Sequence, residues 1–97
     1  MRKVMVRYRI KPGREAENEA LVRAVYEELA RVQPDNFGYA TFTFDERSFV
    51  HFAFQDGDGP SPLPELASFA AFTTDIRERC EEPPVVTELR QVGSYRL

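Results

Sequence analysis

The feature that most constrains this chain is residues 48–54, which read Ser-Phe-Val-His-Phe-Ala-Phe and contain the only histidine. Residues two apart share a face of a strand, so Phe49 and His51 lie on one face and Phe52 and Phe54 on the other. A strand that is apolar on both faces is normally covered on both. A chain of 97 residues can place helices over one face. The simplest cover for the second face is another copy of the chain, which predicts a homodimer.

Hydrophobic periodicity predicts the other elements. Alternation predicts strands at 3–10 and 37–45 beside the strand at 48–54, and a segment rich in branched residues predicts a strand at 85–92. Helical spacing predicts helices at 14–32 and 63–80. The order βαββαβ indicates an α+β, ferredoxin-like fold, an antiparallel sheet with both helices on one face. The length favours a single domain over residues 1–97.

Local signals set the expected ends of the second helix and of the last strand. The Glu-Glu-Pro-Pro run at 81–84 is expected to end the helix, because proline cannot continue it. Asp75 and Arg79, four residues apart, are expected to form an exposed ion pair on that helix. Gly93 is expected to bend or bulge the chain after the last strand.

Composition excludes several classes of protein. A net charge of −3 and a pI of about 5.2 argue against a nucleic-acid partner, because phosphate binding needs a concentrated basic surface. Cys80 is the only cysteine, so the chain has no internal disulfide and no cysteine metal cluster. No stretch reaches transmembrane length and no signal-peptide core follows Met1. These features predict a cytoplasmic protein that does not bind membranes.

Three short patterns resemble those of the antibiotic biosynthesis monooxygenase-like family. They are Lys-Pro-Gly at 11–13 with Glu15 soon after, Phe-Val-x-Phe at 49–52, and Phe-x-x-Phe at 69–72. The resemblance spans essentially the whole chain. It implies a dimeric α+β barrel, in which two sheets face each other, and a cofactor-independent monooxygenase acting on a small aromatic or quinol-type substrate. The alternative is a non-catalytic, dimeric ligand-binding or stress-related module.

The chain departs from that family at several positions. Many members have a glutamate and then a tryptophan in the third strand, where this chain has Ala53 followed by Phe54 and Gln55. Many also have a histidine opening the second helical segment, and residues 63–66 contain none. Haem-degrading members use a tryptophan that presses on the porphyrin, and this chain has no tryptophan. These departures argue against haem degradation, and we expect no cofactor.

His51 is the candidate catalytic residue. Its ordinary pKa lies near neutrality, so it could act as a general base on a phenol or hydroquinone. The structural alternative is a core or interface histidine that is hydrogen-bonded to a tyrosine or a carboxylate. The candidate substrate-binding residues are aromatic: Tyr8, Tyr39, Phe42, Phe69 and Phe72. They could wall a pocket between the sheet and the helices, with Phe44 beside them, or simply form the core.

Four other features have mainly structural explanations. Arg7 and Arg9 would be costly to bury alone and are expected to need acidic partners, for example Glu88 across a dimer interface. Cys80 follows a helix end and precedes two glutamates, where negative potential would raise its pKa and make a nucleophilic role improbable. The Asp-Gly-Asp-Gly run at 56–59 lacks most of a calcium loop and is expected to be a turn.

The fold order leaves one remote alternative, an RNA-binding ferredoxin-like domain. Phe-Val-His-Phe at 49–52 is similar to the end of the third-strand signature of RNA-recognition motifs. The glycine-aromatic-glycine part that should precede it is absent. Met5 and Arg7 stand where the first strand would need an aromatic residue, so we place this alternative last.

Overall fold

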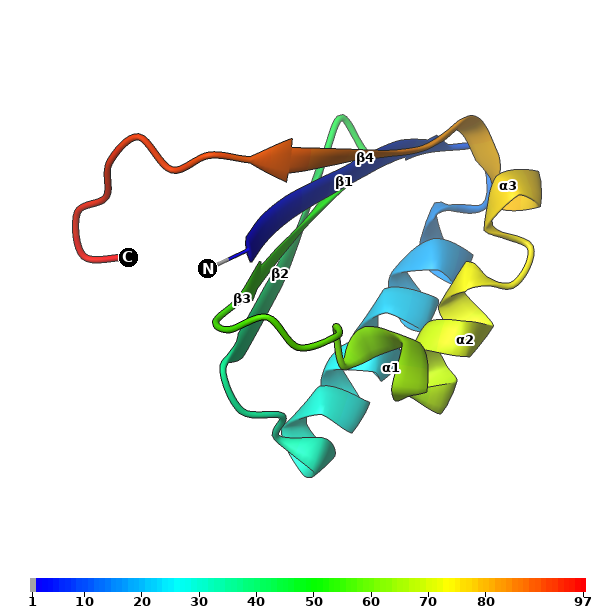
Figure 1. The fold of residues 1–97 in the computed structure, drawn as a ribbon. Coiled ribbons are helices and arrows are strands. Elements are labelled where there is room, and N and C mark those ends of the chain that lie inside the picture. Colours follow the sequence, from blue (N-terminus) through cyan, green and yellow to red (C-terminus); the bar gives the residue numbers. More distant parts are fainter. Residues whose placement is uncertain (1) are drawn as a thin grey trace.

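Four strands form one antiparallel sheet in the computed structural model, which describes residues 2–97 (Figure 1). The strands are β1 (Arg2–Ile10), β2 (Phe37–Phe44), β3 (Ser48–Gln55) and β4 (Cys80–Leu89). The helices are α1 (Glu15–Val32), the 3-10 turn η1 (Leu63–Glu65), α2 (Ala67–Thr73) and α3 (Ile76–Arg79). The sheet order is β2-β3-β1-β4. The predicted ferredoxin-like βαββαβ fold is confirmed.

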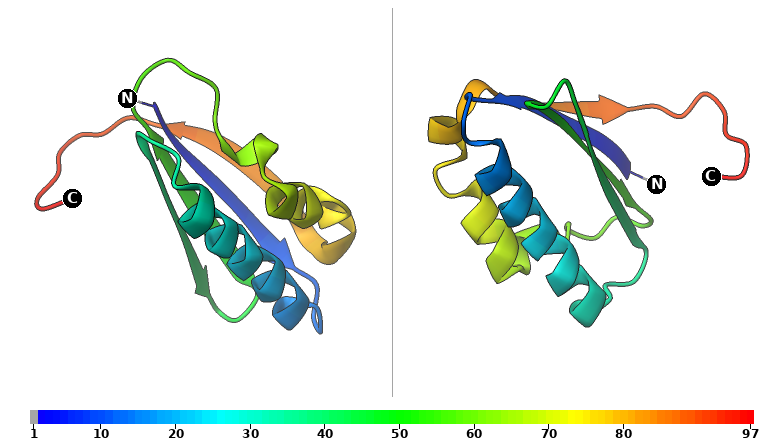
Figure 2. Two further views of the ribbon diagram at one scale, coloured as in Figure 1. Left: turned by 90° about the horizontal axis from the view of Figure 1, so that it is seen from below. Right: turned by 180° about the vertical axis from the view of Figure 1, so that it is seen from behind.

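The two central strands are β3 and β1, and their register decides which side chains meet the helices. Val6 pairs with His51 and Tyr8 with Phe49, so these four side chains share a face. The helices cover this face, because α1 and α2 pack side by side across it (Figure 2). His51 therefore points toward the helices and not toward the open face of the sheet.

The hydrophobic core lies between this face and the helices. Helix α1 contributes Val22 and Val25, which follow the apolar stripe that predicted the helix. Its start is stabilised by Glu15, whose carboxylate accepts a hydrogen bond from the Gly13 amide at 3.0 Å. Gly13 has a φ of +89°, a conformation that glycine adopts without strain.

The second predicted helix is wrong as a single element. Leu66 is extended and Asp75 adopts a left-handed conformation with a φ of 61°, so residues 63–80 divide into η1, α2 and α3. The expected surface pair between Asp75 and Arg79 does not form, because Arg79 turns inward. Its guanidinium donates to the carbonyl oxygens of Phe72 at 2.6 Å and Thr74 at 3.1 Å. It therefore caps the C-terminal end of α2.

Strand β4 begins and ends earlier than predicted. It starts at Cys80 and so includes Pro83 and Pro84, which were expected only to stop a helix. They fall at a register shift against β1, on an edge strand, where a missing amide donor is tolerated. The strand ends at Leu89, so Gly93 lies in an irregular tail and makes no bulge.

The face opposite the helices is uncovered in a single chain and mostly apolar, with Lys3 and Arg7 of β1 among its side chains. Phe42 and Phe44 are each 58% exposed, and Phe52 packs against Phe42 and Phe54. Residues 90–97 extend beyond β4, away from the helices (Figure 1). Within residues 2–97 no helix combines the length and apolar character needed to cross a membrane.

Candidate functional site

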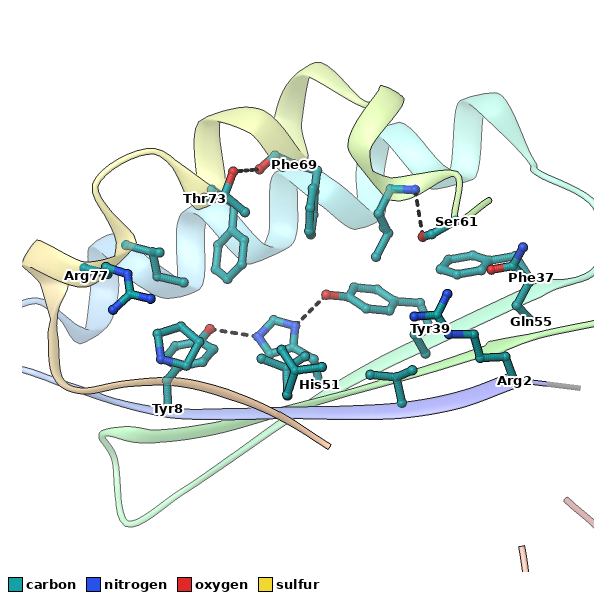
Figure 3. Close-up of a pocket in the computed structure, with 18 residues that line it drawn as sticks. Arg2, Tyr8, Phe37, Tyr39, His51, Gln55, Ser61, Phe69, Thr73 and Arg77 are labelled. Atoms are coloured by element: carbon teal, nitrogen blue, oxygen red, sulfur yellow. Dashed lines mark hydrogen bonds between the residues drawn. The ribbon is translucent and has the colours of Figure 1, made fainter. Parts of the chain in front are cut away.

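A cavity of about 440 Å³ lies between the helix-covered face of the sheet and the segment formed by η1, α2 and α3. The sheet contributes its floor, on which Tyr8, His51 and Tyr39 lie in a row, and Phe69 projects from α2 on the opposite side (Figure 3). The remaining lining is mostly apolar and comes from both layers, including Val4, Val6, Ala53, Leu63, Phe72, Ile76, Pro84 and Val86.

His51 is held at the centre of this floor by a hydroxyl group on each side. Its Nε2 lies 2.7 Å from Tyr8 Oη, and its Nδ1 lies 2.7 Å from Tyr39 Oη (Figure 3). Thr41 Oγ1 lies 3.0 Å from the same Nδ1. Strand register explains the arrangement, because Thr41 pairs with His51 across β2 and β3. Both ring nitrogens are therefore occupied within the protein.

The network continues beneath the cavity. Asn18 of α1 donates from Nδ2 to Tyr8 Oη at 2.9 Å. Arg79 donates to Asn18 Oδ1 at 3.3 Å from Nη2 and at 3.4 Å from Nε. At the other end, Tyr26 Oη lies 2.7 Å from Thr41 Oγ1. A connected row of polar side chains thus crosses the core and is fully hydrogen-bonded, as buried polar groups require.

Burial sets the protonation states of these groups. It lowers the pKa of His51 to about 4, so the imidazole is neutral at neutral pH. It also raises the pKa of Tyr8 and of Tyr39 well above the usual range, so both hydroxyls keep their protons. The row is a set of neutral donors and acceptors apart from Arg79, whose guanidinium stays charged.

Five of the six aromatic or histidine candidates meet at this cavity. Tyr8, Tyr39, His51, Phe69 and Phe72 all line it.

Phe42 does not line this cavity, and its assignment to the same pocket is wrong. Strand alternation places Phe42 on the opposite face from Tyr39 and Thr41, where its ring meets Phe52 edge-on at 6.1 Å. Phe44 shares that open face. Their periodicity in the sequence indicated a common face but not which face the helices cover.

Sequence reasoning missed Asn18 and Arg79, the two polar residues that anchor the network. Both are almost fully buried, with exposures of 0% and 2%. Asn18 lies on the buried face of α1, four residues before Val22 and seven before Val25, so the helical period extended toward the N-terminus would have marked its position. Arg79 was assigned to the surface from its spacing to Asp75. No sequence pattern could have shown that Asn18 and Arg79 are in contact, because they are 61 positions apart in the chain.

The expected interface arginines behave differently from one another. Arg9 is satisfied within the chain by Asp45 and Glu81, at 3.1 and 3.0 Å. Arg7 is exposed on the open face of the sheet. Glu88 lies 3.9 Å from Arg2 in an exposed pair.

The expectation for Cys80 had the right direction and the wrong cause. Burial raises the pKa of the thiol, while the nearby positive charges act in the opposite direction. The run at 56–59 is a loop, as expected. No group of three or more potential metal ligands is found in the part of the chain that the structure describes.

Comparisons with known proteins identify the architecture. No family model matches the sequence, and no curated protein matches it. Solved structures do match. An antibiotic biosynthesis monooxygenase superposes with a TM-score of 0.72 at 20% identity, covering 96% of this chain and 100% of the other. A putative antibiotic biosynthesis monooxygenase from Nitrosomonas europaea superposes with a TM-score of 0.76 at 16% identity. The match covers 94% of this chain and 89% of the other.

A third match is a variant of SnoaB, a cofactor-independent oxygenase from Streptomyces nogalater. It has a TM-score of 0.71 at 16% identity and covers 99% of this chain and 97% of the other. This chain has the antibiotic biosynthesis monooxygenase fold. The resemblance stated from the sequence is confirmed at the level of the fold. Another structure with this fold is a Nitrosomonas europaea protein of unknown function, at 21% identity and a TM-score of 0.73.

Proposed function

We propose that this protein is a cofactor-independent monooxygenase that binds a small phenolic or quinol-type molecule over His51. The observation that carries this proposal is the cavity itself, which has aromatic walls and a row of hydroxyl and imidazole groups on its floor. Its volume of about 440 Å³ falls within the range of small-molecule sites. A planar ring can pack against Phe69 and Phe72 while its oxygen meets the polar row.

The reaction we propose needs only dioxygen. When a phenol becomes a quinone, one oxygen atom of O₂ enters the ring and the other leaves as water. That water takes the ring hydrogen at the attacked carbon and the hydroxyl hydrogen. The substrate supplies the electrons, so no external reductant takes part. The protein contributes binding, orientation and control of the substrate's proton.

His51 acts in this scheme through the two tyrosines. A phenol ionises near pH 10, so moving its proton to an imidazole with a pKa of about 4 costs about 8 kcal/mol. That cost disfavours a free imidazolium as an intermediate. We therefore assign His51 the task of fixing the positions and hydrogen-bond directions of Tyr8 and Tyr39, which it contacts at 2.7 Å.

One observation favours the second candidate function, a non-catalytic ligand-binding protein. The described residues that line the cavity include no aspartate, glutamate, lysine or cysteine. The site thus lacks a conventional base of adequate strength beside His51. Binding would still use the same aromatic walls and the same hydroxyl groups.

We further propose that the protein works as a homodimer through the open face of its sheet. This face carries Phe42, Phe44, Phe52 and Phe54, and large exposed apolar patches mark interaction surfaces. The tail at 90–97 adds exposed apolar side chains that a second copy would cover, among them Val92 at 88%. Single-stranded RNA is the competing occupant, and retention on RNA at low salt without self-association would favour it.

Oxygen consumption on a panel of phenols and hydroquinones tests the enzyme. We expect uptake of O₂ by the native protein and its loss in His51→Ala, provided that the variant folds and assembles normally. Unchanged turnover in His51→Ala would remove His51 from the mechanism. Saturable binding of the panel without any oxygen uptake would instead support the non-catalytic function.

A further inference from the structure

The hydrogen bonds beneath the cavity all run from donor to acceptor in the same sense along the polar row, and Arg79 determines that sense. This guanidinium is 2% exposed, and among residues 2–97 no carboxylate lies within 4.0 Å of it. Its acceptors are the carbonyl oxygens of Phe72 and Thr74 and the side-chain oxygen of Asn18. A guanidinium can only donate, so every bond leaving Arg79 points outward.

Asn18 continues this donor-to-acceptor order toward Tyr8. Because Arg79 only donates, the atom of Asn18 that faces it must be Oδ1, at 3.3 Å. The amide nitrogen then faces Tyr8 and donates to its hydroxyl oxygen at 2.9 Å. The orientation of the Asn18 amide is therefore fixed by its neighbour.

Tyr8 continues the donor-to-acceptor order toward His51. Its side chain is buried, and its hydroxyl contacts only Asn18 Nδ2 and His51 Nε2 among the described residues. Asn18 is a donor at this contact, so the Tyr8 proton has one available acceptor, which is Nε2. A neutral imidazole that accepts at Nε2 carries its proton on Nδ1. That proton is donated to Tyr39 Oη at 2.7 Å and shared with Thr41 at 3.0 Å.

The donor-to-acceptor order ends at Tyr39, a residue that lines the cavity. Tyr39 Oη accepts from His51, and within residues 2–97 it has no other hydrogen-bond partner. Its own proton is thus free for a ligand. The lining adds positive charge and no negative charge: Arg2 and Arg77 lie at opposite ends of the site (Figure 3), and no described lining residue is acidic. Glu88, which lies 3.9 Å from Arg2, is outside the lining and offsets part of the Arg2 charge. The whole chain is nevertheless acidic, with a net charge of −3.

We propose that the cavity selects the ionised form of its ligand, a phenolate or enolate whose oxygen accepts the free Tyr39 proton, and that Asn18 and Arg79 are positioning residues for this bond. The inference rests on the proposed binding of a phenolic molecule and adds its charge state. A chain of donors that begins at a buried cation favours negative charge at its far end, because aligned hydrogen bonds polarise one another. A phenolate also loses an electron to O₂ more readily than a phenol does.

4-Nitrophenol is a suitable probe, because it ionises near neutrality and its phenolate absorbs visible light. We expect its pKa to fall by about one unit on binding, which means about tenfold tighter binding of the anion than of the neutral phenol. The measurement is a pH titration of the absorbance of the bound probe, compared with that of the free probe.

Asn18→Asp is the decisive variant. A carboxylate keeps the shape of the side chain and accepts from Arg79, but it cannot donate to Tyr8. The Tyr8 proton then turns toward the carboxylate, His51 donates from Nε2, and Nδ1 accepts from Tyr39. The Tyr39 proton now points away from the ligand, so we expect the pKa shift of the bound probe to disappear. Tyr39→Phe should remove the shift directly.

Asn36→Asp is the matched control. It makes the same change of charge at an exposed position whose left-handed backbone aspartate tolerates. We expect it to keep the full shift. If 4-nitrophenol binds to the native protein with an unchanged pKa, or if Asn18→Asp keeps the shift while remaining folded by circular dichroism, the inference is wrong although the binding function survives. If neither form of 4-nitrophenol binds, the proposed function fails and the inference fails with it.

Discussion

The two faces of this sheet are built from the same alternating strands and differ in what covers them. The helix-covered face carries the polar row around His51, in which every buried polar side-chain atom has a partner. The opposite face carries phenylalanines, among them Phe42 and Phe44, that are more than half exposed. The covered face thus satisfies its polar groups within one chain. The open face leaves apolar area that only another surface can cover.

If the open face forms the proposed dimer, the two faces have separate tasks. Changes on the covered face should act on stability and on the ligand. Changes on the open face should act on association and leave the cavity intact.

The largest effect is expected from Phe52→Lys at the centre of the open face, where Lys3 and Arg7 already lie on the neighbouring strand. A twofold interface would contain the new cation twice, and burying a charge that has only like charges beside it costs several kcal/mol each time. We expect the dimer to weaken by about 6 kcal/mol, roughly ten-thousandfold, as measured by sedimentation velocity. Ala71→Lys on the exposed side of α2 is the control and should not change the mass. A native protein that sediments as a monomer at micromolar concentration would rule out the dimer itself.

A matched pair of truncations compares the faces directly. In the Phe52→Lys background, Phe49→Ala should lower the free energy of unfolding by about 3–5 kcal/mol, because Phe49 is 3% exposed and its removal leaves a cavity. Phe44→Ala, on the exposed side, should change it by about 0.5 kcal/mol or less. Urea denaturation gives both values. Equal losses at the two positions would show that the open face also stabilises the isolated subunit.

Acid should destabilise the covered face through His51. Its pKa is about 4 in the folded chain against 6.5 in the unfolded chain. Between these values the unfolded chain holds a proton that the folded chain excludes, so stability falls as the pH falls through this window. The loss should reach about 3 kcal/mol at pH 4.

His51→Gln isolates this contribution from that of the carboxylates, which also lose stability in acid. Urea denaturation at several pH values should show a shallower decline for His51→Gln than for the native chain. Parallel profiles for the two proteins would mean that the imidazole is not excluded from protonation by burial.

The smallest effect is expected from Tyr8→Phe, which removes one hydroxyl from the polar row. It leaves Asn18 Nδ2 and His51 Nε2 without their shared partner, at a cost of about 2 kcal/mol. Tyr95→Phe is the control, because Tyr95 is 77% exposed and its hydroxyl should contribute nothing measurable. Thermal denaturation compares the two. A stable Tyr8→Phe would indicate that the row is not needed for folding.

Much of the fold was predictable because its signals are local. Alternation defined β1 and β2, a short run that is apolar on both faces defined β3, and an apolar stripe defined α1. The helical segment after residue 62 was harder. Its break depends on Arg79, which caps α2 from a position beyond the break. Residue spacing alone predicts one continuous helix here, because the i, i+3 and i+4 positions remain apolar through the segment.

The site was predictable where chemistry and periodicity coincide. His51, Tyr8 and Tyr39 are aromatic or titratable and lie on strands, so alternation predicts which residues of the same strand share their face. It does not predict which face the helices cover, and the strand register of the structure decides that. Asn18 and Arg79 are ordinary polar residues on helices, and their roles depend on tertiary contacts between α1 and the end of α3. Phe42 is the opposite case. Its aromatic side chain suited a ligand pocket, but strand register places it on the open face, outside the cavity.

The prolines of β4 have a consequence for how copies of this chain can combine. Pro83 and Pro84 supply no amide hydrogens, and they sit on an outer strand at a shift in pairing. A further strand laid along this border would find a gap in the ladder. Growth of the sheet sideways, the route by which exposed strands form fibrils, is obstructed on this side. The proposed dimer, which joins two sheets through their exposed phenylalanines, does not use this border.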